Sequence, residues 1–339
     1  MAARQAASGA ALRRSSIVPI HALFLIAAMA LVGSNVGFGK SIVAVMPVML
    51  FALLRFVIAV ACMAPWYRPS RMRRVTRVTR GEWTNLFLQA LFGTFGFTLL
   101  MLNGVRLTSA LAAGIITSTI PATVALLSWL VLREKPSGHT LVSVTLAVAG
   151  VALLNADRGG EFAGAAPADA ARALLGNALV MGAVLCESVY VVLSRRLTQT
   201  LPAIEICAYT HLIGALLMLP LGLAPLLTFD LPSVPPHIWG LVVWYALSAS
   251  LFSFWLWMKG IRHVPAHLAG VFTSVLPIAA AAYGIIALGE APGWAHGAAL
   301  ACVVAGILVA SWPARPRRTV PRGRMPDPLD PLDPSLDHD

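Results

Sequence analysis

Residues 103–154 align with residues 259–310 without a gap, at a constant offset of 156 positions. The two segments share fifteen identities over 52 columns, several of them at residue types that an apolar sequence rarely matches by chance. These pairs are Gly104/Gly260, Arg106/Arg262, Gly114/Gly270, Thr117-Ser118/Thr273-Ser274, Pro121/Pro277, Glu134/Glu290, Pro136/Pro292 and Gly150/Gly306. The chain therefore contains a duplicated unit, and its fold must accommodate one pattern twice.

The composition places this duplicated unit in a membrane. Of the 339 residues, 58% are hydrophobic and only 12% are charged, whereas about a quarter of the residues of a typical soluble domain are charged. The mean hydropathy of +0.79 agrees with this interpretation. The lipid bilayer is therefore the first expected partner. Duplicated membrane domains are typical of transporters, so a small-molecule substrate is the second expected partner.

Ten apolar runs have approximately the length that a helix needs to cross a bilayer, about 20 residues. Only helices satisfy their own backbone hydrogen bonds within a single segment in lipid, so the chain is predicted to be an all-α membrane protein with ten transmembrane helices. The expected spans are 18–39, 43–65, 84–102, 108–132, 139–155, 174–194, 203–226, 238–258, 266–288 and 295–312.

The distribution of Lys and Arg predicts the orientation. With the N-terminus in the cytoplasm, the inside segments carry twenty of these residues and the outside loops carry four. An excess of positive charge on the cytoplasmic side predicts that both termini are cytoplasmic and that the protein is a multi-pass protein of the cytoplasmic (inner) membrane. Five helices per half then make the two halves inverted repeats. Glu134 is expected in an inside loop and its counterpart Glu290 in an outside loop.

The same pattern divides the chain into two five-helix repeats with short flanking segments. The predicted boundaries are 1–17 for a cytoplasmic N-terminal segment, 18–155 for the first repeat, 156–173 for a linker, 174–312 for the second repeat and 313–339 for a disordered cytoplasmic tail. The tail is rich in Pro, Arg and Asp and has too few apolar residues to form a core.

No cofactor or metal is expected. The four cysteines lie in apolar runs without metal-binding or redox spacing, and the chain has no His-Glu-x-x-His motif. The net charge of +11 is explained by the inside loops, so no nucleic-acid partner is predicted. The sequence leaves the oligomeric state open between monomer and homodimer.

Ionisable groups inside membrane spans need a partner or a water-filled cavity, so Arg55 and Glu187 are candidate substrate-pathway residues. Arg55 lies near the middle of the second span, where it could attract a carboxylate or serve as scaffold. Glu187, Tyr190 and Ser194 share one face of the sixth span. Glu187 could couple transport to protons, bind a substrate amine, or be a structural acid. His211 is the approximate counterpart of Arg55 in the seventh span.

Matched proline positions are candidate gates. Pro121 and Pro277 are each expected to kink their helix and free the carbonyl four residues earlier, on Thr117 and Thr273. The hydroxyls of these threonines and of the adjacent Ser118 and Ser274 could bind such freed groups. A purely architectural kink is an equally acceptable interpretation of the pattern.

Two further residues are substrate-pathway candidates. Asn35, near the outer end of the first span, could line the pathway or form hydrogen bonds between helices. Trp255 belongs to a group of aromatic residues in the eighth span, and it could line a pathway for a partly apolar solute or pack against neighbours.

Several of these residues lie in motifs that resemble the EamA domain of the drug/metabolite transporter superfamily. The segments that carry the resemblance are LLSWLVLREKP after Pro121, VLPIAAAAYGIIALGEAP in the second repeat, PVMLFALLRFVIA at 47–59 and GSNVGFGK at 33–40. Val32 stands where the family usually has Trp. The resemblance spans about residues 17–312. It implies ten helices in two inverted domains, a central cavity, alternating access and, frequently, export of amino acids or related metabolites.

The sequence therefore favours a secondary transporter that exports a small metabolite. An amino acid or a related compound is the best candidate for that metabolite. An uptake carrier or a lipid-linked-sugar flippase of the same fold is the alternative. A membrane-embedded enzyme or sensor is a remote alternative. It would need two catalytic groups close together, for which Glu187 with His211 is the available pair. The protein is thus predicted not to be an enzyme.

Overall fold

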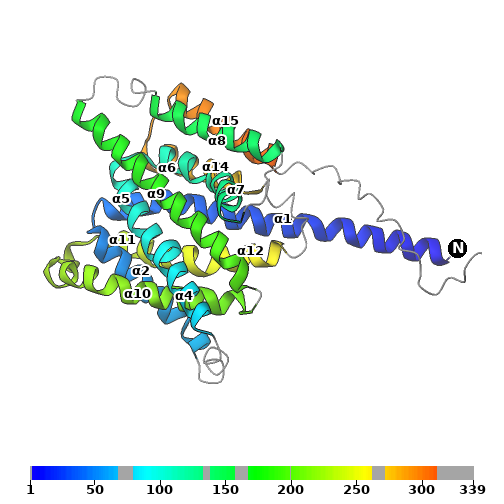
Figure 1. Ribbon diagram of the computed structural model, residues 1–339, viewed down its shortest axis with the longest axis horizontal. Helices are drawn as coiled ribbons and strands as arrows, with labels where there is room; N and C mark the ends of the chain where they lie inside the picture. Colours follow the sequence, from blue (N-terminus) through cyan, green and yellow to red (C-terminus); the bar gives the residue numbers. More distant parts are fainter. Residues whose placement is uncertain are drawn as a thin grey trace, which may run out of the picture.

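The computed structural model describes residues 2–67, 79–132, 138–156, 167–198, 200–261 and 272–310. All regular structure in these ranges is helical. The helices pack into one bundle, from which the N-terminal part of α1 projects (Figure 1). The predicted C-terminal tail lies outside the described residues, as does the loop that contains Glu134.

The first matched unit contains the helices up to residue 156. They are α1 (Ala2–Val43), α2 (Val48–Cys62), the 3₁₀ turn η1 (Ala64–Tyr67), α4 (Arg80–Gln89), η2 (Ala90–Gly96), α5 (Phe97–Leu107), α6 (Ala110–Thr117), α7 (Ile120–Leu132) and α8 (Gly138–Ala156). The helix α1 covers much of the predicted N-terminal segment and extends beyond the predicted end of the first span.

The second unit follows the same order. Its elements are α9 (Pro167–Leu197), α10 (Ala203–Thr228), η3 (Leu231–Ser233), α11 (Pro236–Leu247), η4 (Ser248–Phe252), α12 (Ser253–Ile261), α14 (Val275–Leu288) and α15 (Trp294–Ala310). The helix α9 begins at Pro167, inside the segment predicted as a linker, so part of that segment is helical.

Six helices in the described ranges are long and apolar enough to cross a membrane: Ile20–Val43, Arg80–Leu107, Ala110–Leu130, Asp169–Ser194, Ala203–Thr228 and Pro236–Gly260. Four shorter apolar helices accompany them: Val48–Cys62, Gly138–Leu154, Val275–Leu288 and Trp294–Val309. The membrane-spanning character of the chain is thus supported by length and composition. The orientation of its ends and the number of spans stay predictions.

Two long helices contain a π-helical segment at matched positions. The segment η2 joins α4 to α5, and η4 joins α11 to α12. The repeat offset of 156 places Ser248–Phe252 on residues 92–96, which fall within η2. A π segment widens a helix locally and often marks a functional site, and no residue spacing in the sequence indicated either one.

The two units also pack on each other with pseudo-two-fold symmetry. A Cβ on Gly150 of α8 would lie 3.0 Å from the carbonyl oxygen of Ala299 in α15. A Cβ on the matched Gly306 would lie 3.1 Å from the carbonyl oxygen of Ser143, the residue that the repeat pairs with Ala299. The helices α8 and α15 lie side by side at one edge of the bundle (Figure 1). The matched glycines therefore give the same close approach of α8 and α15 in both directions.

A second pair of contacts crosses between the units in the same way. In α5, a Cβ on Gly104 would meet the side chain of Val180 at 2.6 Å, on α9. In α12, a Cβ on Gly260 would meet the side chain of Leu25 at 2.6 Å, on α1. The third helix of each unit thus packs against the first helix of the other, which joins the two repeats into one body.

These contacts make a stability prediction. Gly306→Val should destabilise the purified protein by about 1–3 kcal/mol, because the added side chain overlaps α8 in a close-packed interface. Gly297→Val, on the same helix, is the matched control, since a Cβ there has no neighbour within 4 Å. Equilibrium unfolding in mixed micelles measures both variants. Equal losses would show that the α8–α15 contact is not tight in the protein.

Candidate functional site

A group of buried and partly buried polar side chains surrounds Arg55 of α2. We call it the Arg55 cluster; it comprises Asn35, Arg55, Thr98, Glu187, Tyr245 and Ser248. Arg55 is only 7% exposed, and its Nη1 donates a hydrogen bond to Thr98 Oγ1 on α5 at 2.7 Å. Its guanidinium carbon lies 5.1 Å from the ring centroid of Phe56 and 5.4 Å from that of Tyr245. Both distances permit cation–π attraction, so the charge is held among aromatic faces.

The second unit contributes Ser248, the first residue of η4. Its Oγ donates to Asn35 Oδ1 on α1 at 2.8 Å and also lies 3.3 Å from the carbonyl oxygen of Tyr245. Asn35 is 5% exposed and Ser248 is fully buried. The helix-to-helix hydrogen bond expected as one role of Asn35 is therefore present, and it fixes the start of the π segment against α1.

The acid of the cluster is Glu187 on α9, which is partly buried. It interacts electrostatically with Arg55. No ion pair joins the two charges among the described residues. Tyr190, one turn further along α9, packs on η2, because a Cβ on Gly93 would overlap its ring. The structure thus brings Glu187 towards Arg55, and it places Tyr190 against the π segment.

His211 of α10 also lies beside Phe56, with ring centroids 6.1 Å apart. Its Nδ1 lies 2.8 Å from the carbonyl oxygen of Cys207, which requires Nδ1 to donate. Its Nε2 can then accept from Ser250 Oγ at 3.0 Å. Both ring nitrogens of His211 are therefore used within its own helix and η4. The imidazole has no ring nitrogen left for a substrate or for catalysis with Glu187.

The matched proline segments interrupt their helices more strongly than the sequence predicted. The helix α6 ends at Thr117 and α7 starts at Ile120, with a two-residue turn between them, and a turn at 273–274 precedes α14. Thr117 Oγ1 donates to the carbonyl oxygen of Ala113 at 2.6 Å, and Ser118 Oγ donates to that of Ile115 at 2.6 Å. The expected single kink is thus corrected to a break. The hydroxyls of Thr117 and Ser118 thus bond carbonyls one turn earlier on their own helix, as Ser and Thr side chains commonly do in helices.

In the second unit, Thr273 and Ser274 are partly buried and Pro277 is buried. The carbonyl oxygen of Pro277 faces the first unit, and it would lie 3.9 Å from a Cβ built on Gly114 of α6. The Cβ of Ala280 in α14 would lie 2.4 Å from the same built Cβ. The helices α6 and α14 thus meet beside the two breaks.

Trp255 lies apart from the Arg55 cluster. Its side chain is 54% exposed, and the Nζ of Lys259, one turn later on α12, lies 3.8 Å from its ring centroid. The ring therefore faces outward from the bundle, which is where an aromatic residue of a membrane helix commonly lies.

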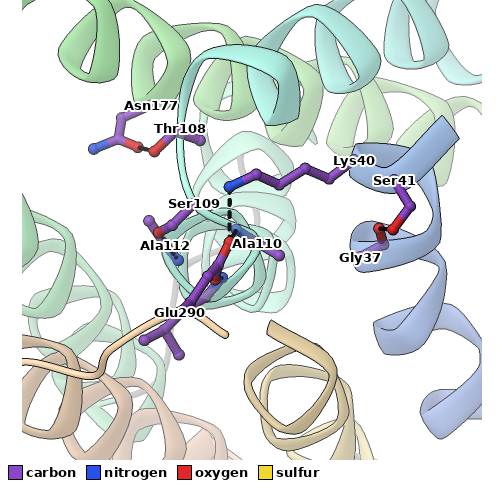
Figure 2. A network of polar contacts seen from close by, with 10 residues as sticks. Gly37, Lys40, Ser41, Thr108, Ser109, Ala110, Ala112, Asn177 and Glu290 are labelled. Atoms are coloured by element: carbon purple, nitrogen blue, oxygen red, sulfur yellow. Dashed lines mark hydrogen bonds and ion pairs between the residues drawn. The ribbon is translucent and has the colours of Figure 1, made fainter. Parts of the chain in front are cut away.

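A second polar site joins the two units; we call it the Glu290 network (Figure 2). Glu290 Oε1 accepts from the backbone N–H of Ala110 at 2.7 Å, and Oε2 accepts from that of Leu111 at 2.9 Å. Lys40 Nζ of α1 forms an ion pair with Oε1 at 2.7 Å. The carboxylate thus satisfies the first N–H groups of α6 at the positive end of that helix.

Local features position this carboxylate. Gly289, with φ of 67°, ends α14 in the left-handed conformation that glycine adopts without strain. The N–H of Glu290 then bonds the carbonyl oxygen of Gly284 at 3.0 Å, which turns the side chain towards α6. The sequence showed Glu290 as a matched acid and gave no indication of its partners, which lie 179 or more residues away.

The described residues contain no group of three or more His, Cys, Asp or Glu side chains that could hold a metal ion. Apolar helices in two matched units, with buried charges where the units meet, define a multi-pass membrane transporter.

Comparison with known proteins identifies the family. Residues 19–156 and 174–312 each match the model of the EamA-like transporter family, so the chain belongs to that family, which fits the drug/metabolite transporter superfamily. The chain is 36% identical over 286 residues to the protein of Bacillus subtilis (strain 168) named Uncharacterized transporter YetK, covering 84% of each chain. It is 25% identical over 257 residues to Uncharacterized transporter YwfM of the same organism, covering 74% of this chain and 81% of that one.

A solved crystal structure shares the fold. It superposes with a TM-score of 0.58 at 23% sequence identity, over 86% of this chain and 96% of the other. At this identity the similarity concerns the fold alone.

Proposed function

We propose that this transporter exports a small metabolite, an amino acid or a related compound, across the cytoplasmic membrane by alternating access. The observation that carries the proposal is the Arg55 cluster. Its members come from α1, α2 and α5 of the first unit and from α9, α11 and η4 of the second. Transporters built from inverted repeats bind their solutes where the repeats meet, and buried charges mark that place.

Glu187 is the group that we assign to proton coupling. The charged and titratable groups that interact with it are Arg55 of α2 and, on its own helix, Cys186 and Tyr190. With no ion-pair partner in the described part of the chain, its carboxylate is available to bind and release a proton during the cycle. We therefore propose that export is coupled to protons through this carboxylate.

An export profile tests the proposed function. Cells that express the wild type or the membrane-inserted double variant Arg55→Ala/Glu187→Ala are loaded with amino acids and dipeptides, and the medium is analysed over time by mass spectrometry. We expect selective accumulation of one compound class with the wild type alone. Equal profiles would refute amino-acid export. Uptake of labelled solutes and of lipid-linked sugars into the same cells then tests the alternative substrates and direction.

A further inference from the structure

Two buried donors of the Arg55 cluster have no hydrogen-bond partner. They are Nε of Arg55 and Nδ2 of Asn35, on side chains that are 7% and 5% exposed, and the absence of a partner refers to the residues that the structure describes. Buried polar groups in proteins are nearly always hydrogen-bonded, and a buried donor without a partner costs about 1–3 kcal/mol, more when it is charged. Two such donors in one cluster are therefore unexpected for side chains with a purely structural role.

The two donors belong to one connected arrangement. Asn35 is bound to Ser248, whose hydroxyl also contacts the carbonyl oxygen of Tyr245. The ring of Tyr245 faces the guanidinium of Arg55. Arg55 and Asn35 thus flank the same turn of α11 and η4. A cationic N–H and an amide N–H together fit an anionic, acceptor-only group, and a carboxylate is the smallest common one.

Glu187 supplies the opposite charge. It interacts with Arg55 over a distance, yet the two do not form an ion pair in the described part of the chain. Opposite charges in a low-dielectric interior attract strongly, and a direct pair would satisfy both. A cation and an acid held apart in this way match a ligand whose ammonium and carboxylate groups are attached to the same carbon atom.

We propose that the Arg55 cluster binds a zwitterionic α-amino acid, with the carboxylate on Arg55 Nε and Asn35 Nδ2 and the ammonium group on Glu187. The inference rests on the proposed function and narrows its substrate to compounds with a free amino and a free carboxyl group. The hydrogen bond from Arg55 to Thr98 holds the guanidinium in place while Nε stays available.

Binding to the purified protein in nanodiscs tests the proposal. The probes are the twenty proteinogenic amino acids, followed, for each one that binds, by its amide and its deaminated acid. The amide lacks the carboxylate and the deaminated acid lacks the ammonium group. We expect the intact amino acid to bind at least about tenfold more tightly than either analogue, because each analogue leaves buried polar groups unpaired.

Variants then assign each half of the ligand to its residues. Asn35→Ala should reduce the preference for the amino acid over its amide and leave the preference over the deaminated acid unchanged. Glu187→Gln should reduce the preference for the amino acid over the deaminated acid and leave the preference over the amide unchanged. Arg55→Lys keeps the charge without the planar fork and should behave like Asn35→Ala. Should Arg55→Lys fail to fold, Asn35→Ala and Glu187→Gln carry the test.

Matched controls separate this effect from general damage. Ser34→Ala neighbours Asn35, and within the described residues the Ser34 hydroxyl bonds the carbonyl oxygen of Leu31 on its own helix. Glu205→Gln removes another buried acid, on α10. Both control variants should keep the preference for the amino acid over its amide and over its deaminated acid. Variants that bind more weakly without changing either preference would overturn the assignment of residues. Binding of none of the amino acids would overturn the substrate class. In that case, selective export of another metabolite in the cell assay would show that the transport function stands.

Discussion

Glu290→Ala is expected to lower the free energy of unfolding by about 2–3 kcal/mol, because one side chain makes two backbone hydrogen bonds and an ion pair. The replacement removes the cap from α6 and leaves Lys40 of α1 without its partner (Figure 2). The side chains are 13% exposed for Glu290 and 29% exposed for Lys40, so solvent screens the pair only in part. Equilibrium unfolding of the purified protein in mixed micelles measures the change.

The cap and the ion pair can be separated. Lys40→Met removes only the ion pair, so it should cost less than Glu290→Ala, since the carboxylate still accepts from the N–H groups of Ala110 and Leu111. Asp230→Ala, at an exposed acid between α10 and η3, is the control and should leave stability near the wild-type value. Equal losses in Lys40→Met and Glu290→Ala would mean that the cap of α6 contributes nothing.

Glu187→Gln is expected to abolish the acceleration of transport by a pH gradient. Glutamine keeps the size of the side chain and cannot bind or release a proton, so the variant should still exchange substrate at equal pH on both sides, at raised substrate concentration. Proteoliposomes with labelled substrate allow both measurements on one preparation. Glu205→Gln is the matched acid and should retain the response to the gradient. A gradient response of wild-type size in Glu187→Gln would exclude Glu187 as the coupling group.

Much of this architecture could be predicted from the sequence, because the architecture depends on local residue patterns and on the repeat. The duplicated unit, the apolar helices and the close approach at Gly150 and Gly306 all follow from residues that the repeat matches. Arg55 and Glu187 were apparent as charges in apolar segments. Their presence in one cluster follows only from the packing of α2 against its neighbours and of α9 across the units.

Other features could not be predicted, because they join residues that are far apart or depend on backbone register. Ser248 bonds Asn35 across 213 positions of the chain. The partners of Glu290 are two backbone N–H groups, which have no sequence signature. The breaks before Pro121 and Pro277 were expected as kinks. A proline in a helix predicts that backbone hydrogen bonds are lost, but the sequence does not show whether the helix bends or ends there.

The pseudo-two-fold packing has a thermodynamic consequence for the proposed alternating access. If the two repeats were identical, exchanging their conformations would turn the outward-facing state into the inward-facing state at no cost, and the two populations would be equal. The resting bias of the transporter is therefore set by the positions where the copies differ. Arg55, whose approximate counterpart in the second repeat is His211, is a difference of this kind. The conformational bias of such a chain therefore comes from its departures from its own symmetry.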